Sequence, residues 1–216
     1  MSKVLRLRAS EAGYSLVEMT VILGIMGVLA GMAVVTISGS RPAALGDGAM
    51  RVVLSQLNTA RELAITQRRN MRVTFTLGNK VEILREEVPP AVAGTTTTIS
   101  SVLMEGGLQF LTVVNLVDTP DAFCSALTAV CFPTATGTPP EVKFRPDGTF
   151  VNQDGAILNG TIFVALPSQT YVSGHSTDGV LSGRAVTIQG STGRVRGYRF
   201  DGSLLSLPTN SYWKPV

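Results

Sequence analysis

The longest hydrophobic stretch of the chain lies close to its N-terminus. From Met19 to Ile37, 19 consecutive residues carry no charge. As a helix, this run would be roughly 28 Å long, close to the ~30 Å hydrocarbon core of a bilayer. No later stretch of this length is as hydrophobic, so the pattern predicts that the chain enters a membrane once.

A one-sided helical pattern follows the apolar run. Arg41 and Pro42 predict a kink or break at its end. Beyond them, apolar residues recur at the i, i+3, i+4 and i+7 spacing of an amphipathic helix: Met50, Val53, Leu54, Leu57, Ala60 and Ala64. The pattern predicts a helix over about residues 43–70 that packs its apolar side against a globular head.

From residue 71 onward the period of the pattern is two. Val73, Phe75 and Leu77 alternate with polar residues, and Gly78-Asn79 supplies a tight turn before the return strand at 80–85. Further strands are expected at 142–144, 149–151, 161–166, 184–188 and 194–200, whereas residues 87–140 show no assignable pattern. We therefore expect an α+β fold, with a long N-terminal helix packed on an antiparallel β-sheet head.

Charge and cysteine content narrow the function only slightly. The net charge is +3, and Lys3, Arg6, Arg8 and Glu11 contribute +2 of it. The chain from Tyr14 onward is thus nearly neutral, which gives no support for a nucleic-acid partner of the protein as a whole. Cys124 and Cys131 lack the C-x-x-C spacing of metal or redox motifs. In an oxidising compartment they would close a small disulfide loop, and two free thiols are the alternative.

Residues 1–40 have three possible interpretations: a secretory signal, a simple membrane anchor, or a leader followed by a retained helix. A secretory signal would have a shorter apolar stretch and a cleavage site after it, as Ser38-Gly39-Ser40 imitates. A simple membrane anchor suits the basic start but explains neither Gly13 nor Glu18. A leader that is cut before the hydrophobic segment explains both residues, and the helix then stays on the mature protein.

The run from Gly13 to Glu18, followed by an unbroken apolar helix, resembles the prepilin motif of type IV pilins and type II secretion pseudopilins. The resemblance implies that residues 1–13 are a leader removed by a prepilin peptidase, and that Tyr14 is the first mature residue and is N-methylated. It also implies a membrane and polymerisation helix at 14–40 and a periplasmic head at 41–216. The partners would be other pilins or pseudopilins and the inner-membrane assembly platform. Tyr14 and Ser15 stand where phenylalanine and threonine are commoner in this family.

Glu18 has two physical explanations. A carboxylate close to the membrane interior costs roughly 2.5–3.5 kcal/mol unless it is paired, and the resemblance implies that it meets the free amine of a neighbouring subunit during assembly. Ser15-x-x-Glu18 also fits a capping box at a helix start, where a negative charge suits the helix dipole. The two roles are compatible.

The sequence contains no catalytic constellation, and we expect neither enzymatic activity nor a cofactor. His175 is the only histidine, in a Ser/Gly-rich loop, and no phosphate-binding or zinc spacing is present. Asp147 and Asp154 each precede a glycine, as turns require.

A basic cluster occupies the last part of the chain. It consists of Arg184, Arg194, Arg196, Arg199 and Lys214. Arg194 and Arg196 alternate on one strand, so both side chains are expected on one face, where they could hold successive phosphates. The helix, the Phe144–Gly148 turn and the late hairpin together resemble minor pilins and pseudopilins of the GspH/FimT family. Gly193 to Arg196 also resembles the Gly-Arg-x-Arg element that DNA-binding minor pilins of the FimT type use in DNA uptake. The sequence thus favours a structural fibre subunit and leaves DNA binding as the alternative.

Overall fold

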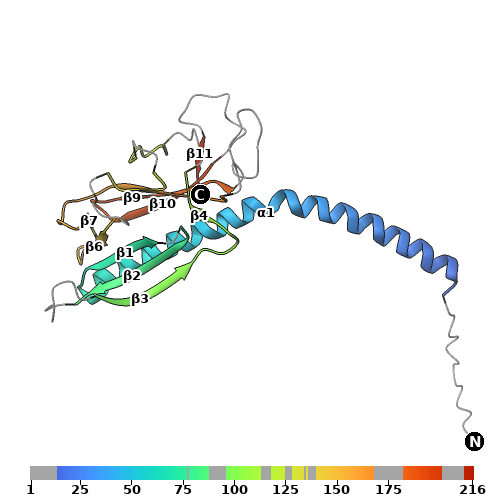
Figure 1. The fold of residues 1–216 in the computed structure, drawn as a ribbon, viewed down its shortest axis with the longest axis horizontal. Coiled ribbons are helices and arrows are strands. Elements are labelled where there is room, and N and C mark those ends of the chain that lie inside the picture. The colour runs from blue at the N-terminus through green and yellow to red at the C-terminus, as the bar shows by residue number, and fades with distance from the viewer. Residues whose placement is uncertain are drawn as a thin grey trace, which may run out of the picture. The chain divides into compact units, whose positions relative to one another are not determined.

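The structure is a computed structural model that describes residues 14–76, 78–87, 96–112, 118–124, 128–133, 135, 140–167, 182–200 and 212–216, with only the backbone described for 35–40. The chain divides into two compact units, residues 1–40 and 41–216. The fold is α+β, with an N-terminal helix packed on antiparallel sheets as expected (Figure 1).

One helix, α1 (Leu16–Gln67), replaces the two helical segments that the sequence predicted. The backbone carbonyl of Ser15 accepts the first helical hydrogen bond, from the Met19 N–H at 3.1 Å, which places Ser15 at the N-cap position. Of the kink or break predicted at Pro42, the break is wrong, because the helix continues through this residue. Pro42 is buried, and the packing of the following turns outweighs the hydrogen bond that its missing N–H removes.

The first part of α1 is apolar on all sides. Residues Leu16–Val34 have a mean hydropathy of 2.1 with none of the stretch buried, and they form one candidate membrane span among the described residues. Side chains as large as Leu23 and Met26 are more than half exposed. A helix that is hydrophobic all round needs an apolar environment, and the described residues do not bury this part of α1.

The eleven described strands form two antiparallel sheets of five and six strands, and in the six-stranded sheet β5 pairs with β8 outside the main strand order. Sheet A has the order β3-β2-β1-β6-β7, from β1 (Met71–Thr76), β2 (Lys80–Glu86), β3 (Thr96–Leu103), β6 (Val142–Phe144) and β7 (Phe150–Asn152). Sheet B has the order β11-β10-β9-β8-β4, from β4 (Gln109–Phe110), β8 (Gly160–Ala165), β9 (Arg184–Gln189), β10 (Arg194–Phe200) and β11 (Trp213–Pro215), and β5 spans Val130–Cys131.

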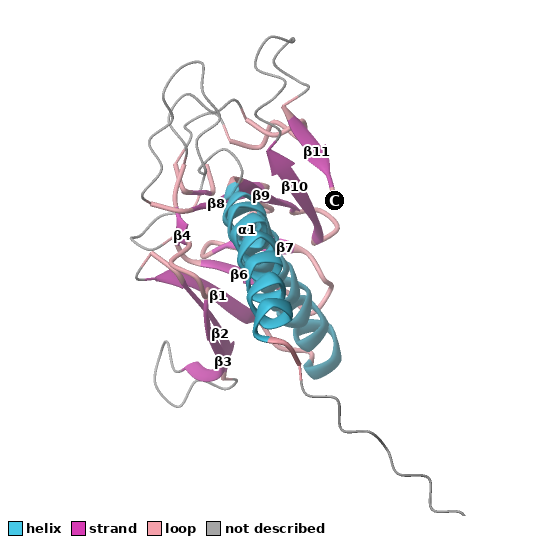
Figure 2. Ribbon diagram, turned by 90° about the vertical axis from the view of Figure 1, so that its right-hand side faces the viewer, coloured by secondary structure: helices cyan, strands magenta, loops and turns pink. Residues whose placement is uncertain are grey.

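The buried stripe of α1 joins the two sheets in one core. Met50, Val53, Leu57, Ala60 and Ala64 are each at most 1% exposed, which confirms the predicted stripe; Leu54 is partly buried beside it. The same core contains inward side chains of both sheets: Val73 and Ile83 from sheet A, Ile162 and Val186 from sheet B. Figure 2 shows strands of both sheets beside the C-terminal half of α1.

Close approach of β10 to α1 depends on a missing side chain at Gly197. A Cβ at this position would lie 2.9 Å from Met50 Sδ and 3.1 Å from Leu54 Cδ1. The small residue therefore lets β10 lie directly on the helix.

Most strands with a clear two-residue period were predicted correctly. The β1–β2 hairpin and β6 match their predictions closely, β10 has the predicted bounds, and β7 to β9 differ by about a residue at an end. By contrast, β3, β4, β5 and β11 were not predicted as strands. The Thr-rich run 96–98, in the stretch that showed no assignable pattern, is the beginning of β3, which lies at the edge of sheet A.

Candidate functional site

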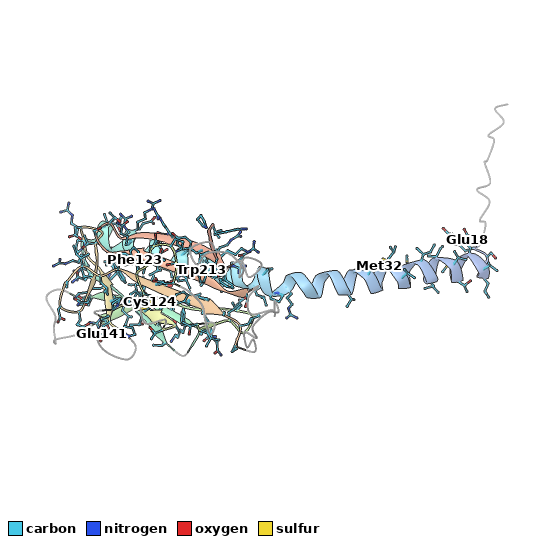
Figure 3. The ribbon with its side chains drawn as sticks, turned by 90° about the horizontal axis from the view of Figure 1, so that it is seen from above. Glu18, Met32, Phe123, Cys124, Glu141 and Trp213 are labelled. Atoms are coloured by element: carbon cyan, nitrogen blue, oxygen red, sulfur yellow. A yellow bond between two sulfur atoms is a disulfide. The ribbon has the colours of Figure 1, made fainter. Side chains whose placement is uncertain are left out.

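The residues of the proposed leader junction lie at the start of α1. Gly13 lies outside the described residues. Tyr14 is 74% exposed, and Glu18 is exposed in the first helical turn (Figure 3). The acidic side chain is thus at the N-terminal end of the helix dipole, where a negative charge is stabilised, and it is accessible to a partner.

The five basic residues singled out in the sequence do not form one surface. Along β10 the odd and even residues point to opposite faces of sheet B. Gly197 lies against α1, so Arg199 is on the helix-facing side, together with the directly opposite residues Arg184 and Lys214. Arg194 and Arg196 are on the other side, which we call the outer face.

Arg184 is not available to a nucleic acid, contrary to the sequence prediction. Its side chain is 0% exposed, and its Nε donates to Asp47 Oδ1 at 2.6 Å. Its other donors reach the carbonyl oxygens of Gly183 at 2.8 Å and Ala43 at 2.9 Å. Burial lowers the pKa of the Arg184 guanidinium, an effect that Asp47 opposes. Arg184 therefore fastens β9 to the helix.

Asp47 also contacts a second arginine of this face. Arg199 Nη2 lies 3.5 Å from Asp47 Oδ2, with 47% of the Arg199 side chain exposed. Lys214 is exposed and stands opposite Arg199 in the register. These side chains belong to the neighbourhood of α1 and are separated by the sheet from Arg194 and Arg196.

Arg194 and Arg196 share a small hollow on the outer face. Asp121, Phe123, Thr187 and Gln189 also line it. Asp121 Oδ1 lies 3.3 Å from Arg196 Nη1, while Asp121 Oδ2 accepts hydrogen bonds from Thr187 Oγ1 at 2.6 Å and Tyr198 Oη at 3.0 Å. The contact with Tyr198 and the charge of Asp121 raise the pKa of the Arg196 guanidinium. The two arginines share a face, as expected, but a carboxylate already accompanies one of them.

The segment that carries Asp121 is fixed to the sheet by a disulfide. Cys124 and Cys131 are bonded, with their Cα atoms 5.8 Å apart, and Cys131 lies in β5. Asp118 strengthens the segment because its carboxylate accepts hydrogen bonds from the N–H groups of Thr119 and Cys124, both at 2.7 Å. Beside the disulfide lies a second apolar cluster that includes Phe163, Tyr198, Phe200 and Trp213.

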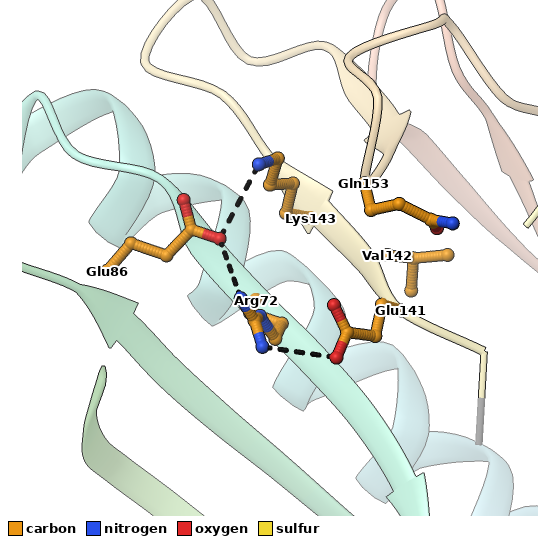
Figure 4. Close-up of a pocket in the computed structure, with 6 residues that line it drawn as sticks. All are labelled: Arg72, Glu86, Glu141, Val142, Lys143 and Gln153. Carbon is orange, nitrogen blue, oxygen red and sulfur yellow. Dashed lines mark hydrogen bonds and ion pairs between the residues drawn. The ribbon is translucent and has the colours of Figure 1, made fainter. Parts of the chain in front are cut away.

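A cavity of about 80 Å³ on the outside of sheet A is lined by charged residues (Figure 4). Arg72 pairs with Glu86 and Glu141, each at 3.3 Å, and Lys143 lies 3.5 Å from Glu86. Burial raises the pKa of Glu86, but a hydrogen bond from Asn70 and the two cations outweigh this and leave the pKa below its usual value. The charges balance one another, so this network stabilises the sheet and does not offer a ligand site.

Other candidate chemistry finds no support in the described part of the chain. No group of three or more His, Cys, Asp or Glu residues suited to a metal ion occurs there. His175 lies outside the described residues. Asp147 caps its own turn by accepting hydrogen bonds from the Thr149 N–H and hydroxyl, at 2.9 and 2.6 Å. Gly148 and Gly155 both have positive φ, so the two Asp-Gly pairs form turns.

Two acidic residues of this region were missed in the sequence. Asp47 is the only acidic residue between Glu18 and Glu62, a signal that could have identified it as the partner of a buried cation. Asp121 lies in the stretch without a recognisable pattern, so nothing in the sequence connects it with Arg196.

Comparison with known proteins identifies no family. No family model matches the chain, and no curated protein does. Two crystal structures of the type IV minor pilin FimU of Pseudomonas aeruginosa are similar to it, at 15% and 16% identity with TM-scores of 0.39 and 0.40. The matches cover 74% and 79% of this chain and 90% and 96% of FimU. These values are too low to assign a function, so the proposals below depend on the residues of the chain itself.

Replacing Asp47 tests the role of the buried arginine. Asp47→Asn leaves Arg184 without its carboxylate, and we expect the free energy of unfolding to fall by about 2 kcal/mol, less than for a fully buried pair because Asp47 is partly exposed. The measurement is thermal unfolding of the full chain in detergent, followed by circular dichroism. Asp154→Asn, in an exposed turn, is the matched control, and equal unfolding temperatures of the two variants would contradict this role.

Proposed function

We propose that the chain is a minor subunit of a bacterial pilin-like fibre, either a type IV pilus or a type II secretion pseudopilus. The observation that carries the proposal is the combination of Gly13, Glu18 and a fully exposed apolar helix that continues without interruption into the core of a globular head. A secretory signal would be lost from the mature protein. Here α1 beyond residue 48 supplies much of the head's core, so cleavage before the helix leaves the helix joined to the head.

In this proposal the leader of residues 1–13 is removed by a prepilin peptidase and Tyr14 becomes the methylated N-terminus. The apolar part of α1 holds the subunit in the inner membrane, with the head in the periplasm. During assembly the same helix leaves the lipid and packs against the helices of other subunits. Either environment supplies the apolar surroundings that Leu16–Val34 need.

In this proposal Glu18 sets the axial position of each subunit relative to its neighbour in the fibre. Its carboxylate is one turn from the free amine of the mature chain and is exposed to a neighbour. An unpaired carboxylate in an apolar helix bundle is costly, so assembly is favoured only where a positive group meets it. The amine of an adjacent subunit is a suitable group.

The first prediction concerns assembly. In cells that contain the peptidase and the partner subunits, Glu18→Gln should be processed normally but should enter sheared fibres on the order of tenfold less than the wild-type chain, because the paired charge is lost. Glu62→Gln is the matched control, since it removes the same charge from an exposed position of the same helix. Fibre incorporation of Glu18→Gln at the wild-type level would refute the assembly role.

A second candidate function is nucleic-acid binding by the outer face of sheet B. The supporting observation is that Arg194 and Arg196, both exposed, line one hollow. Two guanidinium groups on one strand face suit successive phosphates of a backbone. Phe123 adds a partly exposed aromatic ring at the same hollow.

The second prediction concerns this surface. The full chain in neutral detergent should bind a labelled DNA duplex in a salt-dependent manner, and Arg194→Gln with Arg196→Gln should reduce the slope of log affinity against log salt by up to about 2. Arg51→Gln with Arg68→Gln, which also removes two exposed arginines, controls for net charge. Unchanged binding by the double variant would exclude the outer face as the site.

A further inference from the structure

We infer that Asp121 lowers the affinity of Arg194 and Arg196 for the phosphates of a nucleic acid, because its carboxylate already forms an ion pair with Arg196. The inference rests on the nucleic-acid candidate function and concerns its control. A phosphate that approaches Arg196 has to share the guanidinium with a carboxylate that is already 3.3 Å from it. Arg194, which lines the same hollow, has no ion pair with a carboxylate among the described residues.

Asp121 cannot easily give way to a phosphate. Its Oδ2 accepts hydrogen bonds from Thr187 and Tyr198, of which Tyr198 also contacts Arg196 and Thr187 lies in the neighbouring strand β9. Its side chain is 16% exposed, whereas that of Arg196 is 43% exposed. The carboxylate is therefore held by the sheet, and the arginine is the more mobile partner of the pair.

The backbone around Asp121 is also restrained. Three residues further along the chain, Cys124 is bonded to Cys131 in β5, and β5 pairs with β8 of sheet B. Asp118 holds the same segment from its other side through the N–H of Cys124. Because the carboxylate is positioned before any ligand arrives, its repulsion of a phosphate is not relieved by a loop movement.

The size of the effect follows from the exposure of the pair. A partly exposed ion pair in water has a modest strength, and salt screens it. Removing the negative charge should therefore increase affinity for a polyanion about three- to tenfold at low salt. The increase should shrink as the salt concentration rises.

The test compares two variants with the same net charge. The full chain in neutral detergent is titrated with a labelled DNA duplex at two salt concentrations, as wild type, Asp121→Asn and Asp154→Asn. Asp121→Asn keeps oxygen for Thr187 or Tyr198 but loses the charge at Arg196. We expect it to bind about three- to tenfold more tightly than Asp154→Asn. Adding Arg196→Gln to Asp121→Asn should remove this gain.

A second measurement compares DNA binding by Arg194→Gln and Arg196→Gln. Both variants keep Asp121, so the result does not depend on whether Asp121→Asn folds. If Arg196 is already neutralised, Arg194→Gln should weaken DNA binding of the otherwise unchanged chain more than Arg196→Gln does. Equal losses for the two substitutions, or equal affinities of Asp121→Asn and Asp154→Asn, would overturn the inference while leaving DNA binding by this face intact. If neither the wild type nor Asp121→Asn binds DNA, the inference and the nucleic-acid candidate both fail, whereas the fibre-subunit proposal is unaffected.

Discussion

The burial of one stripe of α1 against two sheets is the interaction on which the head depends. Met50, Val53 and Leu57 are almost completely buried in a core that contains apolar side chains of both sheets. Each sheet thereby covers its inner face with the same helix. Gly197 allows β10 to approach this helix closely, and Arg184 fastens the neighbouring strand to Asp47 and Ala43. The position of α1 therefore determines which face of β10 is left for other contacts.

The division of the basic residues follows from this arrangement. Alternation along β10 directs Arg199 toward α1 and Arg196 away from it. Arg184 becomes structural, because a buried guanidinium must have its charge and donors satisfied. On the outer face Arg194 and Arg196 remain exposed, and the disulfide-bonded segment places Asp121 beside them. One strand thus serves both the stability of the head and its proposed contacts with a polyanion.

Local patterns predicted the elements whose periodicity is undisturbed. The stripe of α1, the β1–β2 hairpin and the bounds of β10 could be read from residue spacing alone. The break at Pro42 was predicted wrongly because local propensity does not report the packing of the turns that follow. Arg184 and Arg196 lie on opposite faces of sheet B because of the strand register and the position of the helix. The residue pattern of a single strand reports neither. Asp121 lies in a segment held by a disulfide and by side-chain hydrogen bonds, which leave no periodic signal.

The identity of the mature N-terminus tests the central proposal most directly. The full chain is expressed with and without a prepilin peptidase, and the purified protein is analysed by N-terminal sequencing and intact-mass measurement. A pilin-like subunit must keep the apolar helix that continues into its core, so we predict a mature chain that begins with N-methylated Tyr14, formed only when the peptidase is present. A mature start after Ser40, or a chain that remains uncut with the peptidase, would contradict the proposal.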